Sequence, residues 1–211
     1  MSRAYNISYL DDAQDALGAM LDYAVNACGE DLEQFYVRFI ASGIAKCVSQ
    51  ANPKYMGMSG VEIALQAAQL TGKALPEKEP LIWVGSPEYW TGSTLAYISW
   101  YLNLDFGTLR QRGISAERIC SLFNPFHEAD ISKTVDYIRE ILREHDAREN
   151  PLKRQRILSG MTQQQLAHLS GIPLRVIRSY EQAQRSLGSA SVQTVMRLCQ
   201  VLSCRLEDIV P

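Results

Sequence analysis

Hydrophobic residues recur at intervals of three and four positions along most of the chain, which is the spacing of one face of an α-helix. Leu10, Leu17 and Leu21 fall on one such face, with aspartates on the other faces. Ser59 and Glu62 have the spacing of a capping box and open another helix, which Gly72 closes. The pattern predicts an all-α fold, whose N-terminal helices we expect at residues 8–29, 31–49, 59–72, 86–104, 106–112, 116–123 and 127–148.

One stretch departs from the helical pattern. Residues 73–80 are charged and contain proline, so they predict a surface loop. Residues 81–84 form a short apolar run, and we expect it to be a buried extended segment. Because one strand alone does not make a sheet, the expected fold class stays all-α.

Residues 156–182 predict two short helices joined by a tight turn. Thr162 and Gln165 have the spacing of a capping box at the start of the first helix. Gly171 ends that helix, since a left-handed residue is wanted there. Pro173 suits the first position of the second helix.

The second of these helices has an apolar back and a polar front. Val176, Ile177 and Tyr180 repeat at helical spacing and predict the buried side. A short helix of this kind, with guanidinium groups in front, is what the major groove of DNA admits. Three amphipathic helices of an ordinary bundle are the alternative, which the combined spacing, capping and basic front disfavour. The outer side carries Leu174, Arg175, Arg178 and Ser179.

Residues 152–211 resemble the helix-turn-helix domain of the Cro/C1 repressor family, a five-helix DNA-binding module. The fourth and fifth helices follow at residues 192–202 and 206–210. The resemblance runs without a gap through the helix-turn-helix unit. It rests on Gly160, Thr162, Gln163, Gln164, Leu166, Ala167, Gly171, Ile177 and Glu181.

The resemblance implies roles for individual residues. Gln163 would contact a phosphate, and Arg156 would pair with Glu181 to join the first helix to the third. The residues expected to face base edges are Leu174, Arg175, Arg178 and Ser179.

The chain departs from the family at two places. Gln182 and Ala183 replace the usual glycine-containing turn, so the resemblance does not predict the conformation of the loop after the DNA-facing helix, which we call the recognition helix. Leu174 stands where a hydrogen-bonding side chain is common in the family, so the resemblance predicts the fold but not the sequence specificity. Arg185, in the polar loop that follows, is a further candidate for a phosphate contact.

The net charge of the chain changes sign where the helix-turn-helix region begins. Residues 1–150 hold 13 Lys and Arg against 20 Asp and Glu, a net charge of −7, whereas residues 151–211 hold 8 against 3, a net charge of +5. A basic segment joined to an acidic one is typical of a nucleic-acid module that carries a second domain. We therefore expect an acidic sensing or partner-binding domain at 1–150 and a DNA-binding domain at 151–211, separated at Asn150 and Pro151.

The sequence offers little catalytic or metal-binding chemistry. The five cysteines form no CxxC pair, and no histidine lies at a ligand spacing from them. We expect reduced thiols, a cytoplasmic protein without a signal peptide or membrane span, no cofactor and no metal. We also expect that the chain is not an enzyme. Arg139 and His145 do fit a loose R-x5-H spacing found in helical ribonucleases, but such a pair is expected by chance in an arginine-rich chain.

Aromatic residues concentrate between residues 83 and 101, which include all three tryptophans. They are either the centre of a helical core or an exposed anchor for a partner protein. Trp90, Tyr97 and Tyr101 follow a spacing that places them on one face, and they are the candidate partner surface.

These observations predict a transcriptional regulator, a repressor, that binds double-stranded DNA as a homodimer at a two-fold operator. A sharper hypothesis is the antitoxin of a toxin–antitoxin pair, whose acidic domain covers a basic toxin. The alternatives are a repressor that responds to a small molecule and a helical ribonuclease that uses Arg139 and His145.

Overall fold

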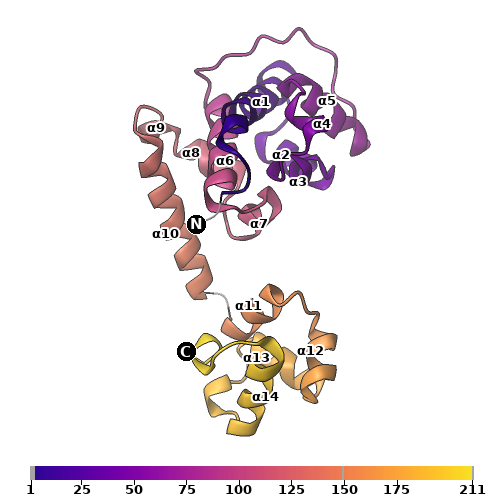
Figure 1. The fold of residues 1–211 in the computed structure, drawn as a ribbon. Helices are drawn as coiled ribbons and strands as arrows, with labels where there is room; N and C mark the ends of the chain where they lie inside the picture. Colours follow the sequence, from indigo (N-terminus) through magenta and orange to yellow (C-terminus); the bar gives the residue numbers. More distant parts are fainter. Residues whose placement is uncertain (1–2, 149, 211) are drawn as a thin grey trace. The chain divides into compact units, whose positions relative to one another are not determined.

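The computed structural model describes residues 3–148 and 150–210. It divides into two compact units, Met1–Leu142 and Arg143–Pro211, and the division falls inside α10 (Ile131–Arg148). The described residues contain helices and no strand, so the all-α fold is confirmed (Figure 1). Within the same residues, we find no helix with the length and apolar character that a membrane crossing requires. The expected domain boundary at residues 150–151 stays a prediction.

Short and medium helices make up the first unit. Two irregular turns flank the first helix: η1 (Ile7–Tyr9) is a 3₁₀ turn and η2 (Tyr23–Ala27) is a π-helical turn. The α-helices are α1 (Leu10–Asp22), α2 (Leu32–Ala41), α3 (Ile44–Ser49), α4 (Pro53–Met56), α5 (Gly60–Leu70), α6 (Pro87–Leu102), α7 (Phe106–Gln111), α8 (Ala116–Ser121), α9 (Phe123–Phe126) and most of α10.

The core of this unit is built around α1, which packs against both α5 and α6. Glycine permits the close approach on each side. A Cβ atom at Gly92 of α6 would collide with the carbonyl oxygen of Leu17, and one at Gly60 of α5 would collide with that of Ala16. Leu17 is buried in the resulting interface. The capping box of Ser59 and Glu62 is present at the start of α5, as predicted.

Several helix boundaries differ from the sequence-based prediction, and two of the differences have a clear local cause. The single helix expected at 31–49 is two helices, because Gly43 adopts a left-handed conformation with φ 79° between α2 and α3. The helix expected from residue 127 begins only at Ile131, where Asp130 Oδ1 accepts the Ser132 N–H at 2.8 Å. In both cases a local backbone or capping interaction interrupts a continuous apolar pattern.

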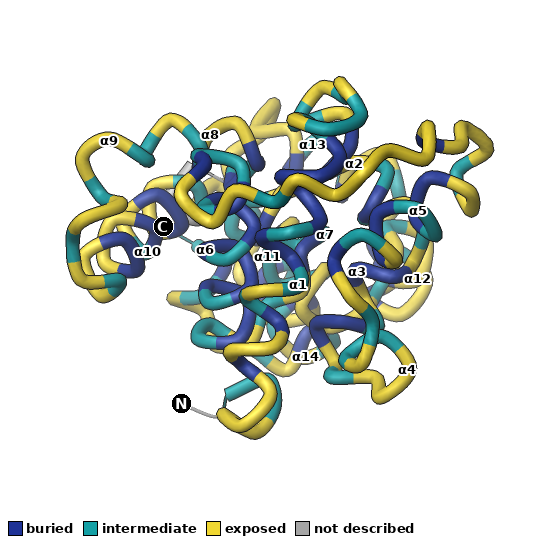
Figure 2. The backbone as a smooth tube through the Cα atoms, turned by 90° about the horizontal axis from the view of Figure 1, so that it is seen from above, coloured by how far each residue is buried: buried dark blue, intermediate teal, exposed yellow. Residues whose placement is uncertain are grey.

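The prediction of a buried extended segment at residues 81–84 is wrong. Leu81, Trp83 and Val84 are 78%, 65% and 66% exposed, and most of the connection between α5 and α6 is exposed (Figure 2). Helix α1 already fills the space between α5 and α6. The extended segment also has no strand partner for its backbone among the described residues, so it runs over the surface.

The second unit has its own core. Its helices are α11 (Pro151–Leu158), α12 (Gln163–Ser170), α13 (Leu174–Glu181) and α14 (Val192–Leu202), with 3₁₀ turns η3 (Leu187–Ser189) and η4 (Leu206–Asp208). Its most deeply buried side chains are those of Leu152, Leu166, Ile177, Leu198 and Ile209. The fifth helix expected at 206–210 is the single 3₁₀ turn η4.

Candidate nucleic-acid interface

The turn between α12 and α13 forms as its sequence predicts. Thr162 Oγ1 accepts the Gln165 N–H at 3.1 Å, and Gln165 Oε1 accepts the Thr162 N–H at 2.8 Å, which completes the capping box. Gly171 ends α12 in the left-handed region, with φ 67°. Pro173, however, is the N-cap residue of α13 rather than its first helical residue, because its ψ of 136° is extended.

Helix α13 has one buried and one exposed side. Ile177 is fully buried and Tyr180 nearly so, as their spacing predicts. Arg175 and Arg178 are exposed. Of the described residues, none forms an ion pair or a hydrogen bond with either guanidinium group. Both groups are therefore available to an external acceptor.

The buried side of α13 is joined to α11 and α12 through Glu181. Arg156 Nε and Nη2 lie 2.6 and 3.0 Å from the two carboxylate oxygens of Glu181. Arg156 Nη1 also donates to the Met161 carbonyl at 2.7 Å. Gln163, at the start of α12, donates its side-chain N–H to Glu181 Oε2 at 2.7 Å. One carboxylate thus holds three helices in register.

The remaining predicted DNA contacts lie on α13 and in the loop after it. Arg185 is exposed. Ser179 is half-buried, and its hydroxyl donates to the Val176 carbonyl at 2.7 Å, so the hydroxyl proton already has an acceptor within the helix. Leu174 is half-buried at the first position of α13.

The turn after α13 contains an alanine in a conformation that favours glycine. Ala183 has φ 55°. The N–H groups of Gln184 and Arg185 both donate to the Ser179 carbonyl, at 2.9 and 3.1 Å. Asn150 contributes a contact that the sequence pattern did not reveal, because its side-chain N–H donates to the Tyr180 carbonyl at 2.7 Å. It ties the beginning of α11 to the end of α13.

The three residues of the expected partner surface are half-buried, and each has an aromatic neighbour. Trp90 packs edge-on against Phe123, with ring centroids 5.8 Å apart. Tyr97 stacks on Tyr101 at 5.8 Å. The Arg3 guanidinium lies 3.5 Å from the centroid of the Tyr101 ring, and hydrogen bonding to Arg3 and then to Arg139 lowers the pKa of the Tyr101 phenol.

An exposed apolar segment, which sequence reasoning placed in the core, lies next to this region in the chain. Its backbone is anchored at Asp22, a buried carboxylate at the end of α1. Asp22 Oδ2 accepts the Trp83 N–H at 3.1 Å, and Oδ1 accepts the Ser86 hydroxyl at 2.5 Å. The anchors hold Leu81, Trp83 and Val84 at the surface. The pattern of polar and apolar residues in the sequence does not predict that these three side chains are exposed.

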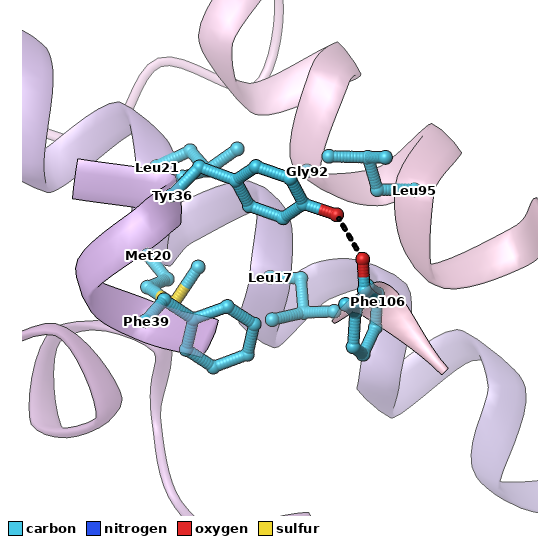
Figure 3. A pocket seen from close by; sticks show the side chains of 8 residues that line it. All are labelled: Leu17, Met20, Leu21, Tyr36, Phe39, Gly92, Leu95 and Phe106. Carbon is cyan, nitrogen blue, oxygen red and sulfur yellow. Dashed lines mark hydrogen bonds between the residues drawn. The ribbon is translucent and has the colours of Figure 1, made fainter. Parts of the chain in front are cut away.

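The first unit contains a very small internal cavity and a surface groove. The cavity, bordered by Tyr36 and Phe106 among others, measures about 10 Å³, which is near the lower limit for a single water (Figure 3). The groove measures about 330 Å³ and is within the range of small-molecule sites. Its lining residues are Asn26, Ala27, Lys78, Glu79 and Leu81.

Arg139 contacts residues other than His145. Arg139 Nη1 is 3.2 Å from Asp136 Oδ1, and its Nη2 donates to the Tyr101 hydroxyl at 3.2 Å. Six residues correspond to about one and two-thirds helical turns, so the two side chains leave α10 on different faces. Among the described residues, no three His, Cys, Asp or Glu side chains cluster so that they could hold a metal ion.

The comparison with protein families agrees with the geometry of the second unit. Residues 152–209 match a family model described as Helix-turn-helix, which confirms the resemblance seen in the sequence. No curated protein and no solved structure matches the chain. The family match supports a DNA-binding regulator of transcription. Residues 152–209 are a helix-turn-helix domain of the Cro/C1 type.

Proposed function

We propose that the chain is a sequence-specific transcriptional repressor that places α13 in the major groove of its operator. The observation that carries this proposal is the outward position of Arg175 and Arg178 on a helix whose back is fixed by Ile177 and Glu181. An arginine bound bidentately to guanine contributes about 1–3 kcal/mol of discrimination. Arg175 and Arg178 are thus the residues proposed to select the sequence.

Gln163 and Arg185 are the proposed phosphate contacts. The Gln163 amide has two N–H donors, so the bond to Glu181 leaves a second donor for DNA. Contacts of this kind position the protein and make binding salt-dependent, but they carry no base information. The positive charge of residues 151–211 supports this role.

We further propose a homodimer on a two-fold operator, with half-sites about 34 Å apart. The second unit exposes Leu158, Val192 and Met196, at 73%, 71% and 63%. These side chains offer apolar surface to a second copy. Sedimentation of the full chain with and without operator DNA gives the mass of the bound species, and a monomer on DNA would contradict the dimer.

The test of DNA binding starts from a selection with random duplex DNA and the full chain. The double variant Arg175→Ala/Arg178→Ala should bind the selected duplex at least about 30-fold more weakly, for a loss of about 1 kcal/mol or more at each position. The charge-matched control is Lys46→Ala/Lys133→Ala, two exposed lysines of the first unit. If both double variants bind equally, or if no duplex is retained at low salt, the proposal fails.

A protein partner for the first unit is a second proposal, in the form of a toxin that the chain neutralises as an antitoxin. Leu81, Trp83 and Val84 support it, because an ordered, exposed apolar segment is typical of an interaction site. The acidic character of residues 1–150 favours a basic partner. The surface of Trp90, Tyr97 and Tyr101 stays an alternative prediction with less accessible area.

Co-expression with the product of the adjacent gene tests this second proposal. The wild-type chain should relieve a growth defect that this product causes, and the variant Leu81→Ala/Trp83→Ala/Val84→Ala should not. Retained operator binding by the triple variant is the control for folding. Absence of any rescue by the wild type rejects the antitoxin role.

Two alternatives have direct assays. The groove beside Leu81 favours a repressor that responds to a small molecule, and such a ligand would raise the melting temperature with its concentration. The ribonuclease alternative requires cleavage of RNA that Arg139→Ala and His145→Ala each abolish. Equal lack of activity in the wild type and the variants would reject it.

A further inference from the structure

The first residue of the recognition helix is apolar although it does not belong to the core. Leu174 begins α13 and is half-buried. The described side chains that form or cover the core of the second unit include Val176 and Ile177 from the same helix, but not Leu174. Its neighbour Arg175 is exposed. The domain thus covers part of the Leu174 side chain, but packing against the core does not account for a leucine at this position.

The position of Leu174 is one from which bases are read. In helix-turn-helix complexes, the N-terminal residues of the recognition helix contact base edges in the major groove. The base edges there present hydrogen-bond donors, hydrogen-bond acceptors and one apolar group, the C5-methyl of thymine. A leucine satisfies none of the donors and acceptors, so only the methyl group matches its chemistry.

We propose that Leu174 determines specificity by contacting a thymine methyl group in the operator. This inference rests on the proposed function, since it takes α13 to lie in the major groove. It goes further by naming the base and the atom that Leu174 recognises.

The geometry of α13 restricts where this thymine lies. Leu174 and Arg178 are four residues apart, so they are neighbours on one face of the helix, about 6 Å apart along its axis. Base pairs are spaced by about 3.4 Å. The thymine should therefore lie within about two base pairs of a guanine that Arg178 reads.

The test removes the methyl group from the DNA and the side chain from the protein, separately and together. Starting from the selected duplex, each thymine is replaced in turn by deoxyuridine, which lacks only the C5-methyl. One replacement should weaken binding of the wild-type chain by about fourfold, which is the effect of losing the burial of one methyl group. In Leu174→Ala the same replacement should have no effect, because the two changes remove one shared contact.

A matched control separates this contact from general effects of removing a leucine. Leu206→Ala removes the same atoms from a 49% exposed position in η4 of the same unit. It should keep the fourfold response to deoxyuridine whatever its overall affinity. A second variant, Leu174→Gln, should prefer adenine at the same position, because glutamine binds adenine N6 and N7 bidentately.

The outcomes distinguish this inference from the function on which it rests. If the wild type retains no duplex, both fail. If it binds DNA but no deoxyuridine replacement weakens binding, or if Leu174→Ala shows the same response as the wild type, the thymine contact is rejected while DNA binding stands. An unchanged base preference in Leu174→Gln also rejects it.

Discussion

Arg156 and Glu181 form a paired contact in which two guanidinium nitrogens meet two carboxylate oxygens at 2.6 and 3.0 Å. Their side chains are only 11% and 2% exposed. Because the carboxylate also accepts from Gln163, it fixes the start of α12 and the end of α13 together. The orientation of the recognition helix thus depends on one buried charge pair.

Breaking this pair on one side should destabilise the second unit strongly. Arg156→Ala leaves the Glu181 carboxylate buried without its cation, which lowers the free energy of unfolding by about 3–5 kcal/mol. The double variant Arg156→Met/Glu181→Leu removes both charges and should lose much less. Hydrogen exchange of the α12 and α13 amides in the full chain measures both effects. Equal exchange in Arg156→Ala and the wild type would contradict this role.

Ala183→Gly should stabilise the second unit. Ala183 has φ 55°, a conformation that strains an L-residue by about 1–2 kcal/mol. Glycine removes the strain but adds freedom to the unfolded chain, so the expected net gain is about 0.5–1 kcal/mol. The control is Ala190→Gly, where φ is −73° and glycine should destabilise. Thermal unfolding followed by circular dichroism distinguishes a gain at Ala183 from a loss.

Gly92→Ala should destabilise the first unit by about 1–3 kcal/mol or more. The added Cβ would meet the carbonyl oxygen of Leu17, which is backbone and has no rotamer to change. Gly57→Ala is the control, since its nearest neighbour is the Pro53 carbonyl at 4.0 Å. All three tryptophans lie in this unit, so their fluorescence during urea unfolding reports on it. A Gly92→Ala chain as stable as Gly57→Ala would show that α1 and α6 can separate at little cost.

Asp22→Ala should release the segment that carries Leu81, Trp83 and Val84. The variant removes the acceptor of the Ser86 hydroxyl and the Trp83 N–H. Each bond to a charged group contributes about 1.5–3 kcal/mol, so cleavage by trypsin at the exposed Lys78 should be about tenfold faster or more. Asp12→Ala, an exposed position of the same helix, is the control. Unchanged cleavage in Asp22→Ala would mean that the segment is held by other contacts.

Local chemistry made the helix-turn-helix readable from the sequence alone. Thr162 and Gln165 cap α12, Gly171 takes the left-handed conformation, and Ile177 and Tyr180 are buried. Each of these features depends on residues within one or two turns of each other, so spacing carries the signal. The base and phosphate contacts of Gln163, Arg175, Arg178 and Arg185 stay predictions, because they concern DNA.

The same local reasoning failed where residues distant in the sequence determine whether a segment is buried. Residues 81–84 are as apolar as a buried strand, yet most of their side chains are exposed. Asp22 anchors their backbone at the surface, and the close contact of α1 with α6 at Gly92 leaves no space for them in the core.

The sequence by itself determined the helical class, the caps and the character of the recognition helix, because these follow from short-range hydrogen bonds and periodicity. Only the tertiary structure decided which apolar residues are buried, that Gly92 is needed for close packing, and that Asn150 holds the end of α13. Those outcomes depend on which surfaces remain uncovered after the helices have packed, and residue spacing contains no measure of that.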